Sequence, residues 1–265
     1  MKKLIIISLF SICSLSAVNA QDLPADPATD STKITADTVN ISKNFIKLNL
    51  TSILIKNYSL QYERIISRNI SLAMSFRVMP ESTIPYTDNI FRWFDITDPE
   101  DQEMIENLLM SNYAITPEIR FYTGKKRYGN GFYISLFYQY GNYSVKNVLR
   151  NYEPDTGGEA TMVTSGDVSS HTAGFMLGSQ WALGKHMCLD WWIFGPHFGI
   201  SSGDVLGLPS TPLSEGDQQT VEDELNDIDI PMFTQTVEVT ADKVTMIFDG
   251  PWGGIRAGLS IGIKF

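Results

Sequence analysis

The alternation of apolar and polar residues in the last part of the chain restricts its fold more than any other feature. Between residues 253 and 265 one alternate series is apolar and the other is polar or small: Ile255, Ala257, Leu259, Ile261, Ile263 and Phe265 against Arg256, Gly258, Ser260, Gly262 and Lys264. A period of two is the signature of a β-strand with one apolar and one polar face. The sequence therefore predicts a half-apolar strand that runs to the last residue.

The same alternation recurs in seven earlier segments, so we predict eight strands. The seven lie at residues 44–54, 58–66, 70–78, 112–123, 132–140, 169–183 and 187–201. Long connections follow the third, fifth and seventh of them, at residues 80–111, 146–168 and 203–252. If neighbouring strands are antiparallel, these connections share one rim, and the short turns after strands two, four and six share the other. This asymmetry is typical of outer-membrane β-barrels.

A membrane imposes a further condition on such strands. In lipid every backbone donor and acceptor must pair within the protein, so a sheet can span only when it closes on itself. We therefore predict an all-β protein, an eight-stranded antiparallel up-and-down transmembrane β-barrel whose first strand pairs with its last and whose aliphatic face contacts lipid. Aromatic side chains are expected as girdles at the two interfaces. They are Phe121, Phe132, Trp181 and Phe265 near the short turns, and Tyr113, Tyr140 and Trp252 near the long connections.

The long connections contain patterns of their own. In residues 80–111, Asp98 as a cap, Pro99 and the apolar Met104 and Leu108 predict a short helix in an exterior loop. Weak alternation over residues 235–247 predicts a hairpin in the last connection. That connection is also acidic, with Glu215, Asp217, Glu222, Asp223, Glu224, Asp227 and Asp229. These residues have no EF-hand spacing for Ca²⁺, so a solvated acidic loop is the simpler interpretation.

The start of the chain has the pattern of a secretory signal peptide. Lys2 and Lys3 precede an apolar run, and Val18-Asn19-Ala20 supplies the small residues of a cleavage site, so residues 1–20 are expected to be removed. Residues 21–43 are polar and contain Pro24 and Pro27, which predicts a flexible tail before the barrel of residues 44–265. Cys188 is then the one remaining cysteine, so no intramolecular disulfide and no cysteine-based metal site are expected.

The excess of acidic residues argues against nucleic acid as a partner. The chain has 20 basic and 30 acidic residues, and removal of Lys2 and Lys3 changes its net charge from −10 to −12. Its strongest basic cluster is only Lys125-Lys126-Arg127, which argues against binding of nucleic acid. After the signal peptide no apolar run approaches the roughly 20 residues that a membrane-spanning helix needs.

The polar face of the predicted strands carries charges of both signs. They are Lys47, Glu63, Arg77, Glu118, Arg120, Asp190, Arg256 and Lys264. An eight-stranded barrel is just wide enough for its interior to be filled by side chains. We therefore expect these residues to form a lumen network of charge-assisted hydrogen bonds, which would leave a plugged barrel and not a pore.

Several short motifs also carry a resemblance to a known family. They are Tyr62-Glu63-Arg64, Gly195-Pro196, Gly254-Ile255-Arg256 and Gly262-Ile263-Lys264-Phe265. Through them, residues 44–265 resemble the small OmpA/OmpX-like barrels, and most closely a family of such proteins from Bacteroidota without an agreed function. The resemblance implies a location in the bacterial outer membrane. It also implies that Phe265 is the membrane-insertion signal, read by the outer-membrane insertion machinery.

These observations favour an outer-membrane protein of structural, adhesive or surface-recognition type, without catalysis, cofactor or metal. Its expected partners are outer-membrane lipid, the insertion machinery, and an extracellular protein or glycan at the loops. A first alternative is a lipid-modifying enzyme, an acyltransferase or deacylase, because Ser169 and His171 share one face of a strand near the outer rim. A second is a secreted lipocalin-like barrel with the aliphatic face turned inward around a ligand. Alternation alone does not say which face is inside.

Overall fold

The computed structural model describes residues 42–123, 128–155, 157–228 and 231–265. The predicted signal peptide, nearly all of the predicted tail, the basic cluster at residues 125–127 and Asp229 lie outside these residues. The described strands are β1 (Asn44–Asn49), β2 (Tyr58–Ile65), β3 (Ile70–Thr83), β4 (Leu109–Tyr122), β5 (Gly131–Tyr152), β6 (Ala160–Leu183), β7 (Met187–Pro209), β8 (Thr234–Val239) and β9 (Val244–Lys264). The helices are α2 (Leu50–Ile53), α3 (Thr87–Phe94), α4 (Pro99–Asn107) and α5 (Glu215–Asn226).

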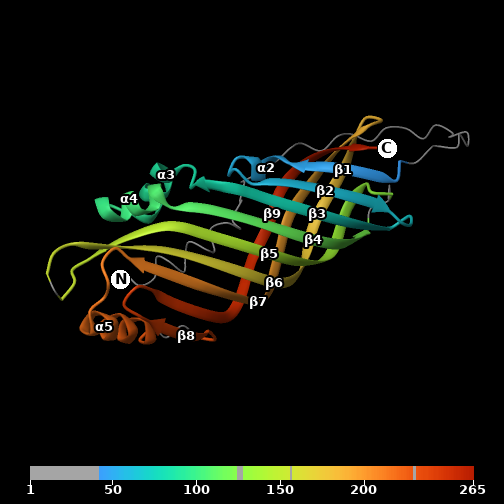
Figure 1. Cartoon of the computed structure of the whole chain (residues 1–265). Coiled ribbons are helices and arrows are strands. Elements are labelled where there is room, and N and C mark those ends of the chain that lie inside the picture. The colour runs from blue at the N-terminus through green and yellow to red at the C-terminus, as the bar shows by residue number, and fades with distance from the viewer. Residues whose placement is uncertain (1–41, 124–127, 156, 229–230) are drawn as a thin grey trace, which may run out of the picture.

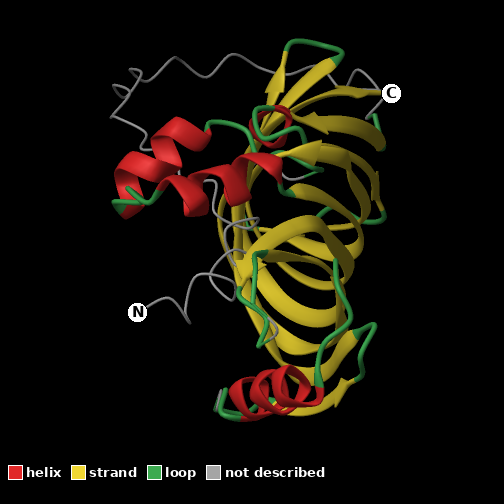
Figure 2. Ribbon diagram, turned by 60° about the vertical axis from the view of Figure 1, so that its left-hand side comes forward, coloured by secondary structure: helices red, strands yellow, loops and turns green. Residues whose placement is uncertain are grey.

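These strands form one antiparallel sheet in a ring-like arrangement (Figure 1, Figure 2). Each strand from β1 to β7 pairs with the next, β7 pairs with β9, and β9 also pairs with β1, where Lys47 lies opposite both Gln61 and Gly262. The all-β class and the antiparallel order are confirmed. The predicted count of eight is wrong for the sheet, because the described residues include a ninth strand, β8, which pairs with the first part of β9.

The connection between β3 and β4 holds two helices where the sequence predicted one. The predicted helix is α4, whose cap Asp98 accepts a hydrogen bond from the backbone of Glu100 at 3.1 Å. The other, α3, begins after Tyr86, which has a left-handed backbone (φ 62°) and no side-chain cap bond. Without a capping residue α3 lacks the usual start signal in the sequence. Its Phe91 packs on Met104 and Ile105 of α4.

The other long connections are more regular than predicted. Strands β5 and β6 stay paired as far as Tyr152 and Ala160, so most of residues 146–168 is a hairpin. Five of the seven acidic residues predicted to lie in a loop, from Glu215 to Glu224, lie in helix α5. Its capping box joins Ser214 and Asp217, and the hydrogen bond from the Ser214 hydroxyl lowers the pKa of the Asp217 carboxyl. The predicted hairpin in residues 235–247 is confirmed by the pairing of β8 with β9.

The first strand is shorter than predicted. Strand β1 ends at Asn49, whose side chain accepts a hydrogen bond from the backbone of Ser52 at 3.0 Å and caps the short helix α2. The helix lies across the end of β1, on the same rim as α3, α4 and α5 (Figure 1). The opposite rim carries the short turns. As expected from the loop pattern, the two rims therefore differ in how much chain they hold.

The two faces of the sheet differ in polarity. The outward side chains of β3, for example, are Leu72, Met74 and Phe76, each about half exposed at 48 to 50%. The predicted girdle residues Phe121, Phe132, Trp181 and Tyr113 are also exposed. The placement of Trp252 was wrong, because it lies on the inward series of β9 and lines an interior cavity. Among the described residues, no helix has the length and apolar character needed to cross a membrane.

Candidate functional site: a charged cluster and a cavity inside the ring

A dense cluster of charges lies inside the ring, near the short turns. The Lys47 ammonium group contacts the Glu63 and Asp190 carboxylates and the Gln180 side chain, with Asp190 at 2.7 Å. The Arg120 guanidinium lies 2.6 Å from Asp190 through Nη1 and 2.8 Å from Glu118 through Nε. All of these groups are almost inaccessible to solvent. Lys47 and Arg120 therefore share Asp190 as a common counter-ion.

Neutral side chains complete the hydrogen bonds of this charged cluster. The Tyr122 hydroxyl donates to Glu63 at 2.7 Å, and the Tyr133 hydroxyl donates to Asp190 at 2.9 Å. The Trp192 indole donates to Asp190 at 3.2 Å, and Arg120 donates to Gln61 at 2.9 Å. Buried charges are stable only when paired and hydrogen-bonded in this way. Among the described charged atoms of this cluster, Oε2 of Glu118 is the one without a hydrogen-bond partner.

The sequence placed these neutral partners on the correct face without identifying their role. Gln61 shares a face with Glu63, Tyr122 with Arg120, and Gln180 faces Asp190 across the β6–β7 pair. The sequence identifies the charged residues because a buried charge needs a partner, whereas an amide or phenol on the same face carries no such requirement. The signal that would have found them is their position in the same alternate series as the charges.

The eight predicted lumen residues do not form one network. Lys47, Glu63, Glu118, Arg120 and Asp190 lie together, and Arg256 is 3.9 Å from Glu118. Lys264 is half-buried near the end of β9, and among the described residues it has no carboxylate within 4.0 Å.

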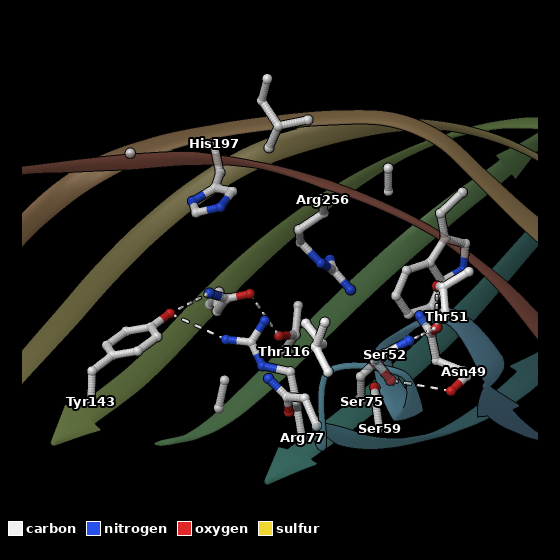
Figure 3. Close-up of a pocket in the computed structure, with 18 of the residues that line it drawn as sticks. Asn49, Thr51, Ser52, Ser59, Ser75, Arg77, Thr116, Tyr143, His197 and Arg256 are labelled. Carbon is white, nitrogen blue, oxygen red and sulfur yellow. Dashed lines mark hydrogen bonds between the residues drawn. The ribbon is translucent and has the colours of Figure 1, made fainter. Parts of the chain in front are cut away.

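Arg77 belongs to a second region, a polar cavity of about 60 Å³ between the charged cluster and α2. Its lining includes Arg77, Tyr143, His197 and Arg256, whose side chains point toward a common space (Figure 3). Serine, threonine, asparagine and glutamine side chains and two tryptophans supply most of the remaining lining, and no carboxylate belongs to it. The cavity is therefore positively charged.

Each arginine of the cavity is held by neighbouring side chains. The Arg256 guanidinium lies over the rings of Phe137 at 4.4 Å and Trp192 at 4.9 Å, which is cation–π geometry. Arg77 donates to the Tyr143 hydroxyl at 3.2 Å, and Gln139 donates to the same oxygen at 3.4 Å. Tyr143 in turn packs on Trp252. These contacts fix the positions of both guanidinium groups.

The residues singled out for acyl chemistry are not arranged as a nucleophile and base. His171 is exposed on the outward face, where its Nδ1 lies 2.5 Å from the Tyr138 hydroxyl. The Ser169 hydroxyl donates to the backbone of Ser202 at 3.2 Å. Within the described part of the chain no hydrogen bond joins Ser169 to His171, which nucleophilic activation would require. The same part of the chain holds no group of three histidine, cysteine or carboxylate residues placed to bind a metal.

Comparison with known proteins gives one family. The family described as "Protein of unknown function (DUF3575)" matches residues 30–195, more than half of the chain. The match includes the residues of the charged cluster and Arg77, and it ends before His197 and Arg256 of the cavity. No curated protein and no solved structure matches the chain.

Proposed function

The chain belongs to the DUF3575 family, and we propose that it is an integral outer-membrane β-barrel with a plugged interior, of structural, adhesive or surface-recognition type. In this proposal β1 to β7 and β9 form the closed wall of the barrel. The rim with α2, α3, α4 and α5 faces the exterior, and the short turns face the periplasm.

The observation that carries this proposal is the outward apolar surface. The alternate residues from Ile70 to Val78 of β3 face outward, as do Leu60 and Tyr62 of β2 and Ile134 and Leu136 of β5. The segment from Ile70 to Val78 matches the roughly 9–11 residues that a tilted strand needs to cross a bilayer. Apolar surface on this scale is rarely left in water, because burying it elsewhere lowers the free energy.

The polarity of the two faces favours this function over the lipocalin-like alternative. A lipocalin-like barrel would turn its aliphatic side chains inward around a ligand. In this protein the inward side chains include Lys47, Glu63, Arg120 and Asp190, and the aliphatic series is outside. Pairing of β1 with β9 supports closure, since an open edge has no hydrogen-bond partners in lipid.

The charged cluster supports a plugged interior. It joins strands that are not neighbours in the ring, since Asp190 of β7 accepts from both Lys47 of β1 and Arg120 of β4. A hydrated channel would need continuous space through this level. The cluster instead fills it with side chains bonded to one another, as expected for a small barrel.

The exterior rim supplies the surface for recognition. Strands β5, β6, β7 and β9 continue beyond the end of β1 and carry α5 and β8, while α3 and α4 stand beside them (Figure 1). We place the structural, adhesive or recognition role on this rim and assign no catalysis to it. Ser169 and His171 each bond to another residue, which weighs against the lipid-modifying alternative.

A pair of arginine substitutions tests the membrane proposal. Met74 lies in the outward face of β3 and Leu208 lies near the end of β7, and both are about half exposed. If the outward face of the ring contacts lipid, Met74→Arg should cost about 2–4 kcal/mol of unfolding free energy in lipid vesicles, and Leu208→Arg, above the membrane, about 0–1 kcal/mol. The measurement is urea unfolding of the mature chain, followed by its heat-dependent shift in gel mobility.

Two results together would contradict the membrane proposal. If the mature chain stays monodisperse in buffer without detergent, and Met74→Arg is as harmless as Leu208→Arg, the outward face is in water and the proposal is wrong. Unchanged lipid A acylation after substitution of His171 would separately reject the enzyme alternative.

A further inference from the structure

The inner charges of the ring do not balance. The side chains that face the charged cluster and the cavity include four cations, Lys47, Arg77, Arg120 and Arg256, and three carboxylates, Glu63, Glu118 and Asp190. The charged cluster uses Glu63 and Asp190 fully, and one oxygen of Glu118 accepts from Arg120. A buried cation without a partner is costly. The excess positive charge therefore falls on the cavity.

Several polar atoms around the cavity have no hydrogen-bond partner. Arg256 is only 9% exposed, and its Nη1 has no hydrogen bond, since the nearest Glu118 oxygen is 3.9 Å away. The same is true of Nε of Arg77 and Nδ1 of His197, which is 8% exposed. Buried polar atoms are normally paired, so the unpaired arginine donors that face one space indicate a missing acceptor.

The cavity is the right size for a small anion. Water needs roughly 10–15 Å³ of such space, so a cavity of about 60 Å³ holds about four to six non-hydrogen atoms. A carboxylate or a phosphate group has that size. Arginine side chains match both groups, because the guanidinium presents several donors in one plane to paired oxygens.

We propose that this cavity binds one oxyanion, a carboxylate or phosphate group, between Arg77 and Arg256. The Tyr143 hydroxyl accepts from Arg77 and Gln139, so its own proton is free to be donated to the anion. Trp192 and Trp252 add apolar surface to the lining of the same cavity. The anion is either a free ion or the terminal group of a larger molecule that enters from the α2 rim.

Titration with simple anions tests this site. The mature chain in detergent micelles, or in plain buffer if detergent proves unnecessary, is titrated with inorganic phosphate, acetate and chloride at constant ionic strength. Binding is followed by calorimetry and tryptophan fluorescence. We expect saturable one-to-one binding of phosphate, acetate or both, and weaker binding of chloride. Preference for phosphate indicates a phosphate group as the natural ligand, and preference for acetate indicates a carboxylate. Absence of saturable binding of either overturns the proposal.

Substitutions locate the site. Arg77→Gln and Arg256→Gln each remove a charged donor and should weaken binding roughly tenfold or more. Arg64→Gln is the matched control, because Arg64 is exposed on the outward face and should keep the affinity within about twofold. If Arg256→Gln fails to fold, the affinity of Arg77→Gln tests the proposal by itself. This variant should fold, because Arg77 is half-buried and no described carboxylate lies within 4.0 Å of it. Equal binding by Arg77→Gln and the parent chain overturns the proposal.

Discussion

Inside the ring, Lys47 and Arg120 each lie within 4.0 Å of two or more carboxylates, whereas Arg77 and Arg256, nearer α2, have no carboxylate within hydrogen-bond distance among the described residues. The two regions share the same wall and the same alternation. They differ in whether the buried cations have carboxylate partners within the chain. In the charged cluster each charged side chain has a partner of opposite charge within hydrogen-bond distance. In the cavity, Nε of Arg77 and Nη1 of Arg256 have no hydrogen-bond partner. Unpaired buried donors of this kind distinguish a binding site from a structural core.

The largest change in stability is expected when a charge is removed from the charged cluster. Asp190→Ala removes the carboxylate that lies 2.7 Å from Lys47 and 2.6 Å from Arg120 and leaves Glu63 as their shared counter-ion, which should cost about 3–5 kcal/mol of unfolding free energy, or prevent folding. The measurement is urea unfolding of the refolded mature chain. Glu81→Ala is the control, because Glu81 pairs with Lys146 on the surface, at 46% and 53% side-chain exposure, and should change stability little. Equal loss in both variants would mean that the charged cluster is not a structural barrier.

Glu118 lies between the charged cluster and the cavity, so its substitution should affect the two regions in opposite ways. Its Oε1 accepts from Arg120 at 2.8 Å, and its Oε2 is 3.9 Å from Arg256 and has no hydrogen bond. Glu118→Gln should cost about 1–3 kcal/mol of stability, because the buried Arg120 loses an ion pair and keeps a hydrogen bond to a neutral acceptor. It should also tighten binding of phosphate or acetate several-fold, since the cavity becomes more positive. Weaker anion binding in a folded Glu118→Gln protein would contradict this account.

The smallest expected change in stability comes from the cavity wall. Tyr143→Phe removes the hydroxyl that accepts from Arg77 at 3.2 Å and from Gln139 at 3.4 Å, and should cost about 0.5–1.5 kcal/mol. Anion affinity should fall at the same time. Tyr138→Phe makes the same chemical change on the outward face and should leave that affinity unchanged. Calorimetric titration of both variants compares them, and similar affinities would remove Tyr143 from the site.

Part of the fold could be read from local sequence because its signals are local. Helix α4 was predicted from Asp98 and Pro99, and the β8–β9 hairpin from its alternation. Helix α5 was missed although its capping box was present, because an aspartate, Asp217, stands where the usual pattern has glutamate or glutamine. Helix α3 had no cap to find. Its start depends on the left-handed backbone of Tyr86 and on the packing of Phe91 against α4.

The sequence by itself determined which residues share a face, because the side-chain period of a strand is a property of the backbone. It thus placed Lys47, Glu63, Arg120 and Asp190 on one side of the wall and the aliphatic series on the other. Only the tertiary structure decided which side is inside, which charges meet, and that Trp252 faces the cavity. Those outcomes depend on strand register and on the pairing of β1 with β9, which join residues more than 200 positions apart. The period of the pattern contains no information about such distant partners, so the division between a paired cluster and an unpaired cavity is a property of the assembled ring.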